Sequence, residues 1–378
     1  MRLRNMKSRR QQSKTLFVAC ALLLLVASLE AADLTVSITN TPSSGTLRFL
    51  FFDSEDGFDG FRAPCRIDSF QCNTQALYRI ESLPEGQYAL LVYHDQNRNK
   101  TLDRNFIGIP KEPVGFSNRY SPKGPPQFRK ALFHISDDKS NNSSIQLSRP
   151  LGKRGRVGVG VGIIGRSSPY SNSNKGPVQV IPAITYIGER IQILGPNAQI
   201  GLMGSNDLRL AATLAYRLGS YEESDSPVLQ GLDDRKQTMM GGLALEWELA
   251  SGADISLAIE HDMLNRINAS TAQIGIKRPF SLGSLRLSPA LAINWQNANA
   301  ANHDFGIPDD RATTVRPAYK LNDTISIESG LGAFLELNRN WKVILNLNVE
   351  FLDPKVRNSP IISEDYVLKG FAAINVVL

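Results

Sequence analysis

The sequence predicts an all-β fold, in which a small β-sandwich is followed by an antiparallel transmembrane β-barrel of ten to twelve strands. Two observations lead to this prediction. Helical periodicity is scarce after residue 32, and the period-two alternation of apolar and polar residues becomes long and repeated near residue 150. We therefore divide the chain into four segments, at residues 1–32, 33–148, 149–155 and 156–378.

Residues 1–32 have the three parts of a secretory signal peptide. A basic segment ends at Lys14, an apolar run extends from Leu16 to Leu29, and the small residues Ala31 and Ala32 follow. The apolar run is shorter than the roughly 20 residues that a helix needs to cross a bilayer. We expect export and cleavage near Asp33, and a retained membrane anchor is the alternative.

The charge balance argues against a nucleic-acid partner. The chain carries a formal net charge of +6, but six basic residues and a single acidic one lie within residues 1–32. The mature chain is therefore almost neutral and offers no broad positive field to a phosphate backbone.

Only two cysteines follow the signal segment, Cys65 and Cys72. In an exported chain, two nearby cysteines indicate a local disulfide, and two free thiols are the alternative. Their spacing matches neither a metal knuckle nor a Cys-x-x-Cys redox motif.

Residues 33–148 show short strand-like segments separated by turn signals, which is typical of a small antiparallel sandwich. Leu83–Gly86 is an expected turn. The expected strands are Leu34–Ile38, Leu47–Phe52, Tyr88–Tyr93, Ala131–Ile135 and Ile145–Leu147. Residues 149–155, rich in glycine and basic residues, are an expected linker.

Residues 156–378 contain longer alternating segments, each with one apolar and one polar face. Phe334 is the exception, because it falls on a polar face. The clearest segments are Leu208–Leu218, Met239–Leu249, Thr324–Leu337, Trp341–Phe351 and Tyr366–Leu378.

Such strands fit a soluble sandwich or a membrane barrel, whose apolar face meets lipid. Segments of about 9–11 residues match a tilted bilayer crossing, and Trp247, Trp295 and Trp341 lie towards strand ends, where aromatic girdles form. These features favour the barrel. About eleven segments are recognisable, and bacterial barrels have an even number of strands, so we expect ten or twelve. The irregular stretch is Val178–Ser205, which contains Pro182 and Pro196.

Residues of about 150–378 resemble the MipA/OmpV family of outer-membrane proteins. The motifs that carry the resemblance are the Pro-centred strand Val178–Tyr186, the tight turn Gly188–Arg190 and the strand Asn206–Arg217. The resemblance implies an outer-membrane location and a non-enzymatic scaffold role, tied to murein synthesis through a lytic transglycosylase and a murein synthase.

Residues of about 33–148 resemble a family of exported β domains of unknown function. The motifs are Leu83–Asp95, followed by Asn97, Asn99 and Asp103, then Phe106–Glu112 and Gly115–Asn118. This resemblance implies a fold and no activity. Because the first strand of a barrel normally starts on the periplasmic side, we expect this domain to lie in the periplasm.

A possible calcium loop lies within that motif. Asp95, Asn97, Asn99, Thr101 and Asp103 have the alternating oxygen spacing of a calcium loop. Lys100 and Phe106 depart from the usual Gly and Glu positions, although Glu112 follows further along. The alternative is an Asx-rich turn whose side chains bond their own backbone.

No motif predicts catalysis or another cofactor. The four histidines form no His-x-x-x-His pair, and there is no Gly-x-Ser-x-Gly elbow. The Val/Gly alternation of residues 157–165 suits a barrel strand better than a dinucleotide loop.

The polar strand faces carry charges of both signs. In a barrel these would converge in the lumen, either as paired charges that fill the interior or as the lining of a hydrated pore. The residues are Arg209, Arg217, Glu246, Glu248, Glu260, Glu328, Glu336, Lys342, Glu350 and Lys369. We expect the filled or narrowly hydrated interior, and therefore a scaffold rather than a small-solute or ion pore.

Overall fold

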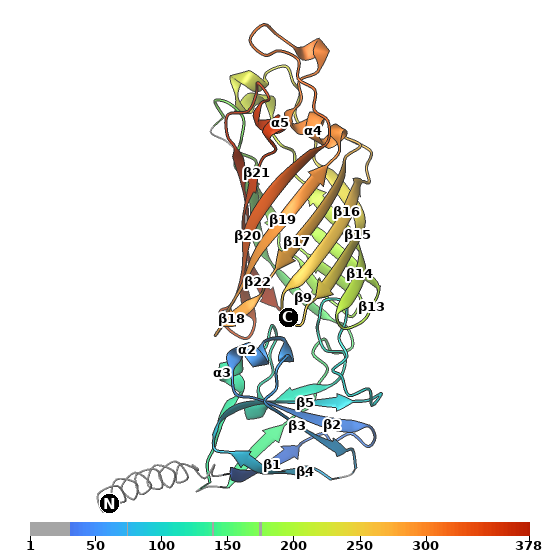
Figure 1. Ribbon diagram of the computed structural model, residues 1–378, viewed down its shortest axis with the longest axis vertical. Coiled ribbons are helices and arrows are strands. Elements are labelled where there is room, and N and C mark those ends of the chain that lie inside the picture. Colours follow the sequence, from blue (N-terminus) through green and yellow to red (C-terminus); the bar gives the residue numbers. More distant parts are fainter. Residues whose placement is uncertain (1–30, 74, 138–139, 174–175) are drawn as a thin grey trace, which may run out of the picture.

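The computed structural model describes residues 31–378 except residues 74, 138, 139, 174 and 175, and it places a small β domain end to end with a barrel (Figure 1). The predicted signal peptide, apart from Ala31 and Ala32, lies outside the described residues. No helix in the described part of the chain is both long enough and apolar enough to cross a bilayer.

The N-terminal domain consists of two sheets that pack face to face. One sheet has the order β4-β1-β8, and the other has the order β3-β2-β5-β6 with β7 also paired to β5. The strands are β1 (Ala31–Ile38), β2 (Thr46–Phe52), β3 (Arg66–Gln71), β4 (Leu77–Pro84), β5 (Gly86–Asp95), β6 (Val114–Phe116), β7 (Leu132–Ile135) and β8 (Asn141–Ile145). The sandwich is confirmed, but β1 and β8 run parallel, so it is not wholly antiparallel as predicted.

The core between the sheets forms because alternate side chains of β1 and of β2 point towards the space between them. Leu34 and Val36 of β1 and Phe49 of β2 are fully buried in one cluster. Burying each such side chain contributes about 1.5–3 kcal/mol relative to leaving it exposed.

A second core lies on the other face of the β2/β5 sheet, the face towards the barrel. There Phe52, Leu91 and Phe116 pack beneath short helices and loops. The helices are α2 (Glu55–Phe58), η1 (Asp59–Phe61), η2 (Ser117–Arg119) and α3 (Phe128–Ala131). β5 is thus buried on both faces, and this third layer is what meets the barrel (Figure 1).

The predicted disulfide is wrong, because Cys65 and Cys72 are both free thiols. They flank the extended strand β3, one at each end. A strand rises about 3.3 Å per residue, which puts the two Cα atoms roughly 20 Å apart, whereas a disulfide needs less than about 7 Å.

The barrel sheet is antiparallel throughout, and β22 pairs with β9 to close it. Its strands are β9 (Arg156–Arg166), β10 (Val178–Pro182), β11 (Thr185–Ile187), β12 (Ile191–Leu194), β13 (Asn197–Gly204), β14 (Leu208–Arg217), β15 (Thr238–Glu248), β16 (Asp254–Asp262), β17 (Ser270–Lys277), β18 (Phe280–Leu282), β19 (Leu285–Gln296), β20 (Thr324–Glu336), β21 (Trp341–Phe351) and β22 (Tyr366–Val377).

The closed ring contains twelve strands, which confirms the even number expected. β9, β11–β17 and β19–β22 form the ring, β10 continues β11 along β9, and β18 pairs with β19. The irregular stretch is a broken strand followed by a short hairpin, β12–β13.

The apolar strand faces point outward, as predicted. Leu291, Ile327 and Leu347 are 55–58% exposed on the outside of the barrel, where lipid would cover them. Their neighbours Lys342 and Asn375, on the inner faces, are only 2% exposed. This contrast is the arrangement that a hydrocarbon solvent requires.

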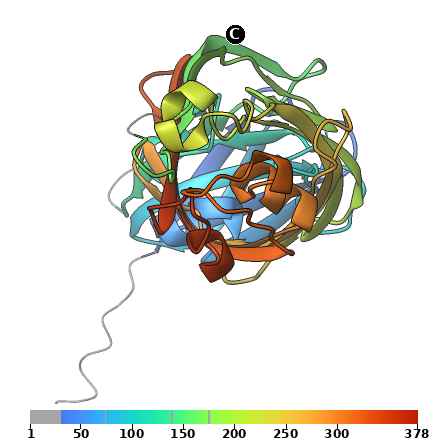
Figure 2. The same cartoon turned by 90° about the horizontal axis from the view of Figure 1, so that it is seen from above.

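The loops at the end of the barrel far from the N-terminal domain form a third core across that opening (Figure 2). Tyr170, Tyr221, Phe305 and Ile361 pack together there. The short helices of these loops are η3 (Glu223–Asp225), η4 (Pro227–Leu229), α4 (Ala298–Phe305), η5 (Asp309–Arg311) and α5 (Pro354–Arg357). We call this cluster the outer lid.

Candidate functional site

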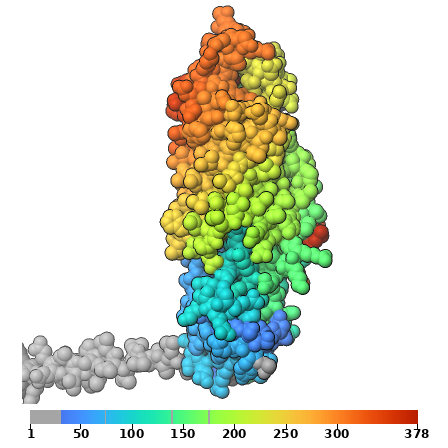
Figure 3. Space-filling model, turned by 90° about the vertical axis from the view of Figure 1, so that its right-hand side faces the viewer, coloured from blue at the N-terminus to red at the C-terminus, as the bar shows by residue number. Residues whose placement is uncertain are grey.

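The strongest candidate site is the junction between the N-terminal domain and the mouth of the barrel. Figure 3 shows the domain packed directly under the barrel. The barrel strands at this end are joined by short turns, which in outer-membrane barrels mark the periplasmic side. The domain therefore covers the periplasmic mouth.

Turns around the mouth hold the domain by hydrogen bonds. The Arg104 N–H donates to Asn206 Oδ1 (3.0 Å), and Asn206 Nδ2 donates to the Leu102 carbonyl (3.2 Å). Asn105 Nδ2 donates to the Gly188 carbonyl (3.2 Å), so a second turn is engaged.

Two further turns on the opposite side of the ring are also bound. The Gly283 N–H donates to Glu55 Oε1 (3.0 Å), and Lys123 Nζ donates to Asn340 Oδ1 (3.1 Å). Contacts spread around the mouth fix the orientation of the domain as well as its position.

Glu248, at the end of β15, joins the domain to the barrel electrostatically. Its carboxylate lies 3.5 Å from Arg62 Nε and 3.7 Å from Arg104 Nη1, both from the domain. Arg209 of β14 approaches to 3.3 Å. Burial lowers the pKa of Arg104, and the nearby Glu248 carboxylate opposes that effect. Since arginine stays charged in proteins, this buried guanidinium needs the carboxylate.

Glu336, at the end of β20, is the corresponding group on the other side of the mouth. Its side chain is 4% exposed and accepts a hydrogen bond from Gln127 Nε2 (2.9 Å) of the domain. Lys130 of the domain and Lys342 of the barrel lie 3.4 and 3.2 Å away. Arg286 of the barrel and Asp59 of the domain form a further ion pair at 2.6 Å.

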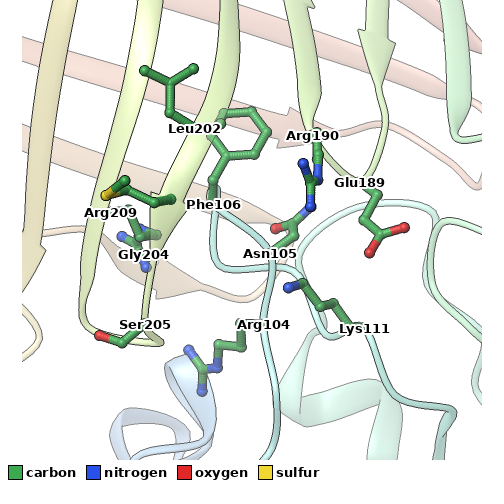
Figure 4. A pocket seen from close by; sticks show the side chains of 12 residues that line it. Arg104, Asn105, Phe106, Lys111, Glu189, Arg190, Leu202, Gly204, Ser205 and Arg209 are labelled. Carbon is green, nitrogen blue, oxygen red and sulfur yellow. The ribbon is translucent and has the colours of Figure 1, made fainter.

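The loop Arg104–Lys111 brings Phe106 close to Leu202 of the barrel (Figure 4). Phe106 lies against Gly201 of β13, where a Cβ atom would come within 2.6 Å of the Phe106 ring. Gly201 is thus required for close packing here, because any side chain would occupy the space of the ring. Around this contact is a small pocket of about 140 Å³.

A larger cavity of about 740 Å³ lies between the domain and the lower lumen. Phe58, Phe61 and Phe116 of the domain line one side, and Leu194, Phe334 and Ile344 of the barrel line another. The charged side chains at the mouth complete its wall. This volume is within the range of about 300–1,000 Å³ that small-molecule sites occupy.

Above the cavity, the charged lumen residues predicted from the sequence form pairs. Lys369 Nζ lies 2.7 Å from Glu328 and 2.8 Å from Glu350. Glu260 instead accepts a hydrogen bond from Thr213 Oγ1 (2.9 Å).

At the outer lid, Asp304 is the central charged group. Arg217 Nη2 (2.7 Å), Ser220 Oγ (3.0 Å) and His303 Nδ1 (2.9 Å) all contact its carboxylate. Burial alone would raise the pKa of Asp304, but Arg217 and His303 outweigh it and hold the pKa well below its usual range. The lid therefore depends on an ionised carboxylate.

The structure folds the predicted calcium loop into a tight turn. Asp95 accepts the N–H groups of Asn99 (3.1 Å) and Lys100 (2.9 Å), which is the behaviour of an Asx-rich turn. The Asp103 carboxylate accepts hydrogen bonds from the side chains of Asn97 and Asn99. Thr101 enters the turn through its N–H, which donates to Asn99 Oδ1 (2.9 Å).

Glu112, which follows the alternating positions 95–103 in the sequence, also holds this turn by hydrogen bonds. Its two oxygens accept the N–H groups of Gln96 (3.0 Å) and Asp103 (3.2 Å), and burial raises the pKa of its carboxyl group. Among the described residues, no three His, Cys, Asp or Glu side chains are grouped to hold a metal ion. Calcium binding here stays a prediction.

Sequence reasoning missed the residues through which the domain docks. Arg62, Arg104 and Gln127 lie in loops or short helices, which carry no periodicity. Phe106 and Asn206 each belong to one of the quoted family motifs, which was one available signal.

Two family models match the chain. The model described as MltA-interacting protein MipA matches residues 159–377, which is more than half of the chain. The model described as an uncharacterized protein conserved in bacteria, DUF2141, matches residues 36–143.

Individual relatives agree with the first model. The outer membrane protein Omp26La of Vibrio anguillarum is 29% identical over 39% of this chain, and the match spans 58% of its own length. The MltA-interacting protein of Escherichia coli is 24% identical over 56% of this chain and 84% of its own. The chain thus spans little more than half the length of Omp26La and of the OmpV protein of Vibrio cholerae.

Among solved structures, the OmpT loop deletion mutant of Vibrio cholerae aligns with 90% of this chain and 99% of its own at 9% identity, with a TM-score of 0.26. A likeness this low adds nothing about function. The relatives and the closed barrel make this chain an outer-membrane protein. By the extent of the first match, it belongs to the family of MltA-interacting protein MipA, and it carries a DUF2141 domain before the barrel.

Proposed function

We propose that this protein is an envelope scaffold, whose barrel anchors the N-terminal domain at the periplasmic face and links the outer membrane to murein-synthesis or remodelling machinery. The observation that carries the proposal is the docking of the domain by turns around the mouth and by Glu248 and Glu336. Docking of this kind holds one face of the domain in a fixed direction.

The face held towards the periplasm is the β4-β1-β8 sheet, at the far end of the domain from the barrel (Figure 1). Leu77 is 56% exposed there, and the side chain of Arg79 is 68% exposed. Arginine is enriched at protein interfaces relative to the rest of the surface. The name of the Escherichia coli relative, MltA-interacting protein, supports a murein enzyme as the partner.

The test is binding of a purified lytic transglycosylase, and separately of a murein synthase, to the full chain in lipid nanodiscs. We expect saturable binding that the double variant Leu77→Asp/Arg79→Glu weakens. The control is Leu264→Asp, an exposed substitution at the opposite end of the molecule. Failure of both enzymes to bind would refute the scaffold role.

A small-solute or ion pore is the second candidate, and the 740 Å³ cavity favours it. Against it, the domain covers one mouth and the outer lid covers the other. Planar-bilayer recording of the full chain separates the two proposals. The scaffold predicts no stable conductance, and a stable open conductance would favour the pore.

A further inference from the structure

The barrel wall is incomplete beside β10. Among the described strands, none pairs with the edge of β10 that faces away from β9. One edge of β12 pairs with β11 and the other with β13, and the β12–β13 hairpin turns at Gly195 and Pro196 before it reaches the level of β10. We call this break, bounded by β10 and the tip of the hairpin, the notch.

The register shows which backbone groups point into the notch. The Arg166 N–H donates to the Pro177 carbonyl (3.1 Å), and the Ala183 N–H donates to the Gly160 carbonyl (3.0 Å). In an antiparallel pair the bonded residues alternate, so Val178, Val180 and Pro182 direct their backbone groups away from β9. Pro182 has no N–H, which reduces the number of donors at this edge, as is usual where proline occupies an edge strand.

Side-chain exposure agrees with an open edge. Val178 and Val180 are 66% and 71% exposed, whereas Val161 and Ile163, their outward-facing neighbours on β9, are 57% and 49% exposed. Backbone at membrane depth is tolerated without a partner strand only where it is covered by protein or lines a cavity. The open backbone groups of β10 must therefore be covered by protein or line a cavity on the inner side of the notch.

The inner side of the notch carries an apolar strip beside the inward-facing Gln179 of β10. A Cβ atom at Gly195 would lie 3.9 Å from Ile181 Cδ1 and from the Phe371 ring, so the hairpin tip touches both side chains. Ile164, on an inward position of β9, continues this surface. Leu194, the residue before the tip, lines the 740 Å³ cavity, so the apolar surface runs from the notch into the cavity.

The cavity itself is positively charged. Nine basic and four acidic side chains line it, a surplus of five positive charges. Arg119 and Arg156 line it and take no part in the ion pairs recorded for the described residues. A lining of this sign attracts an anionic group.

We propose that the notch is a lateral opening, through which the acyl chain of an anionic lipid of the outer membrane enters the barrel while its head group is held by the basic lining of the cavity. The chain occupies the strip of Ile164, Ile181 and Phe371. This proposal does not depend on the scaffold role, because it concerns the barrel wall and not the periplasmic face of the domain.

Contact quenching by brominated lipid tests the proposal directly. The chain has three tryptophans, and all three stand on lipid-facing positions. Replacing Trp247, Trp295 and Trp341 by Phe removes all tryptophan fluorescence from the chain. Phe371→Trp then places a single reporter inside the barrel, and Ile181→Trp provides a second reporter in case the first position does not accept an indole.

Two matched single-tryptophan variants serve as the positive and the negative control. Retaining Trp247 alone reports full lipid contact, and Gln273→Trp places a reporter on the inner face of β17, away from the notch. Heat-modifiable gel mobility checks that each variant is folded.

We expect bromines on phosphatidylglycerol acyl chains to quench the Phe371→Trp reporter to an extent comparable with Trp247 and several-fold more than the Gln273→Trp reporter. Brominated phosphatidylcholine should quench it less. Equal quenching by the two lipids would overturn the anionic assignment. Quenching no greater than at position 273 would overturn the opening, as would a dimer in native mass spectrometry whose β10 edges cover each other.

Discussion

Replacing Glu248 by Gln tests whether charge holds the domain on the barrel. The substitution keeps the shape of the side chain but removes the single negative charge that Arg62 and Arg104 both approach. All three side chains are less than one quarter exposed, so water screens the loss only in part. Removing one partner of a buried charge pair at an interface costs about 2–5 kcal/mol, and the distances of 3.5 and 3.7 Å favour the low end of that range.

A loss of about 2–3 kcal/mol corresponds to a roughly 30- to 150-fold smaller docking equilibrium constant. Hydrogen–deuterium exchange of the Arg104 amide reports it, because this N–H is bonded to Asn206 of the barrel only when the domain is docked. We expect its protection to fall by the same factor.

The matched control is Glu260→Gln, which removes a lumen carboxylate bonded to Thr213 and distant from the domain. Unchanged exchange in the Glu248 variant would refute the electrostatic account of docking. An equal rise in both variants would show that general loosening of the barrel is responsible.

Four further predictions concern the loop contact, the lid and the metal. Gly201→Leu should also raise the hydrogen exchange rate of the Arg104 amide, because the new side chain collides with Phe106. The control Gly370→Ala should leave this rate unchanged, because a Cβ atom there meets nothing within 4 Å. Equal effects of the two substitutions would disprove the packing role of Gly201. Asp304→Asn should destabilise the outer lid by about 3 kcal/mol, measured as faster proteolysis of the outer loops, because Arg217 loses its partner. Since the folded pKa of Asp304 is lowered, the lid of the natural protein should keep its stability above about pH 4 and lose it as the pH falls further, and a pH-independent lid would contradict this. Calcium titration of the full chain by calorimetry should give a heat of binding that Asp95→Asn removes and the exposed Asp56→Asn retains; no heat from the natural chain would exclude the calcium loop.

The barrel could be predicted from the sequence because lipid and lumen impose opposite requirements on alternate residues. β21 begins and ends where the alternation predicted, at Trp341 and Phe351, and β20 differs by a single residue at its end. Such agreement is expected where one face must be apolar along the whole strand.

The exception in that pattern had a structural cause. Phe334 faces inward because it packs against the domain, where a Cβ atom at Gly124 would lie 3.3 Å from its ring. An apolar residue on a polar face was therefore a signal of the junction, but the sequence did not reveal its partner.

The junction as a whole could not be predicted, because loop contacts leave no periodic trace. The disulfide prediction failed for a related reason. Sequence separation does not show that residues 66–71 are extended, and an extended segment carries its two ends apart.

The position of the domain has a consequence for how the cylinder is sealed. Arg156 of the first barrel strand donates to the Pro122 carbonyl (3.0 Å), and Lys123 donates to the Val377 carbonyl of the last strand (3.5 Å). One short loop thus grips both sides of the seam where β9 meets β22. Because the domain binds β9 and β22 when their edges are paired, docking of the domain favours closure of the barrel, and closure favours docking. Removing the domain should therefore weaken the closure of the barrel at this line.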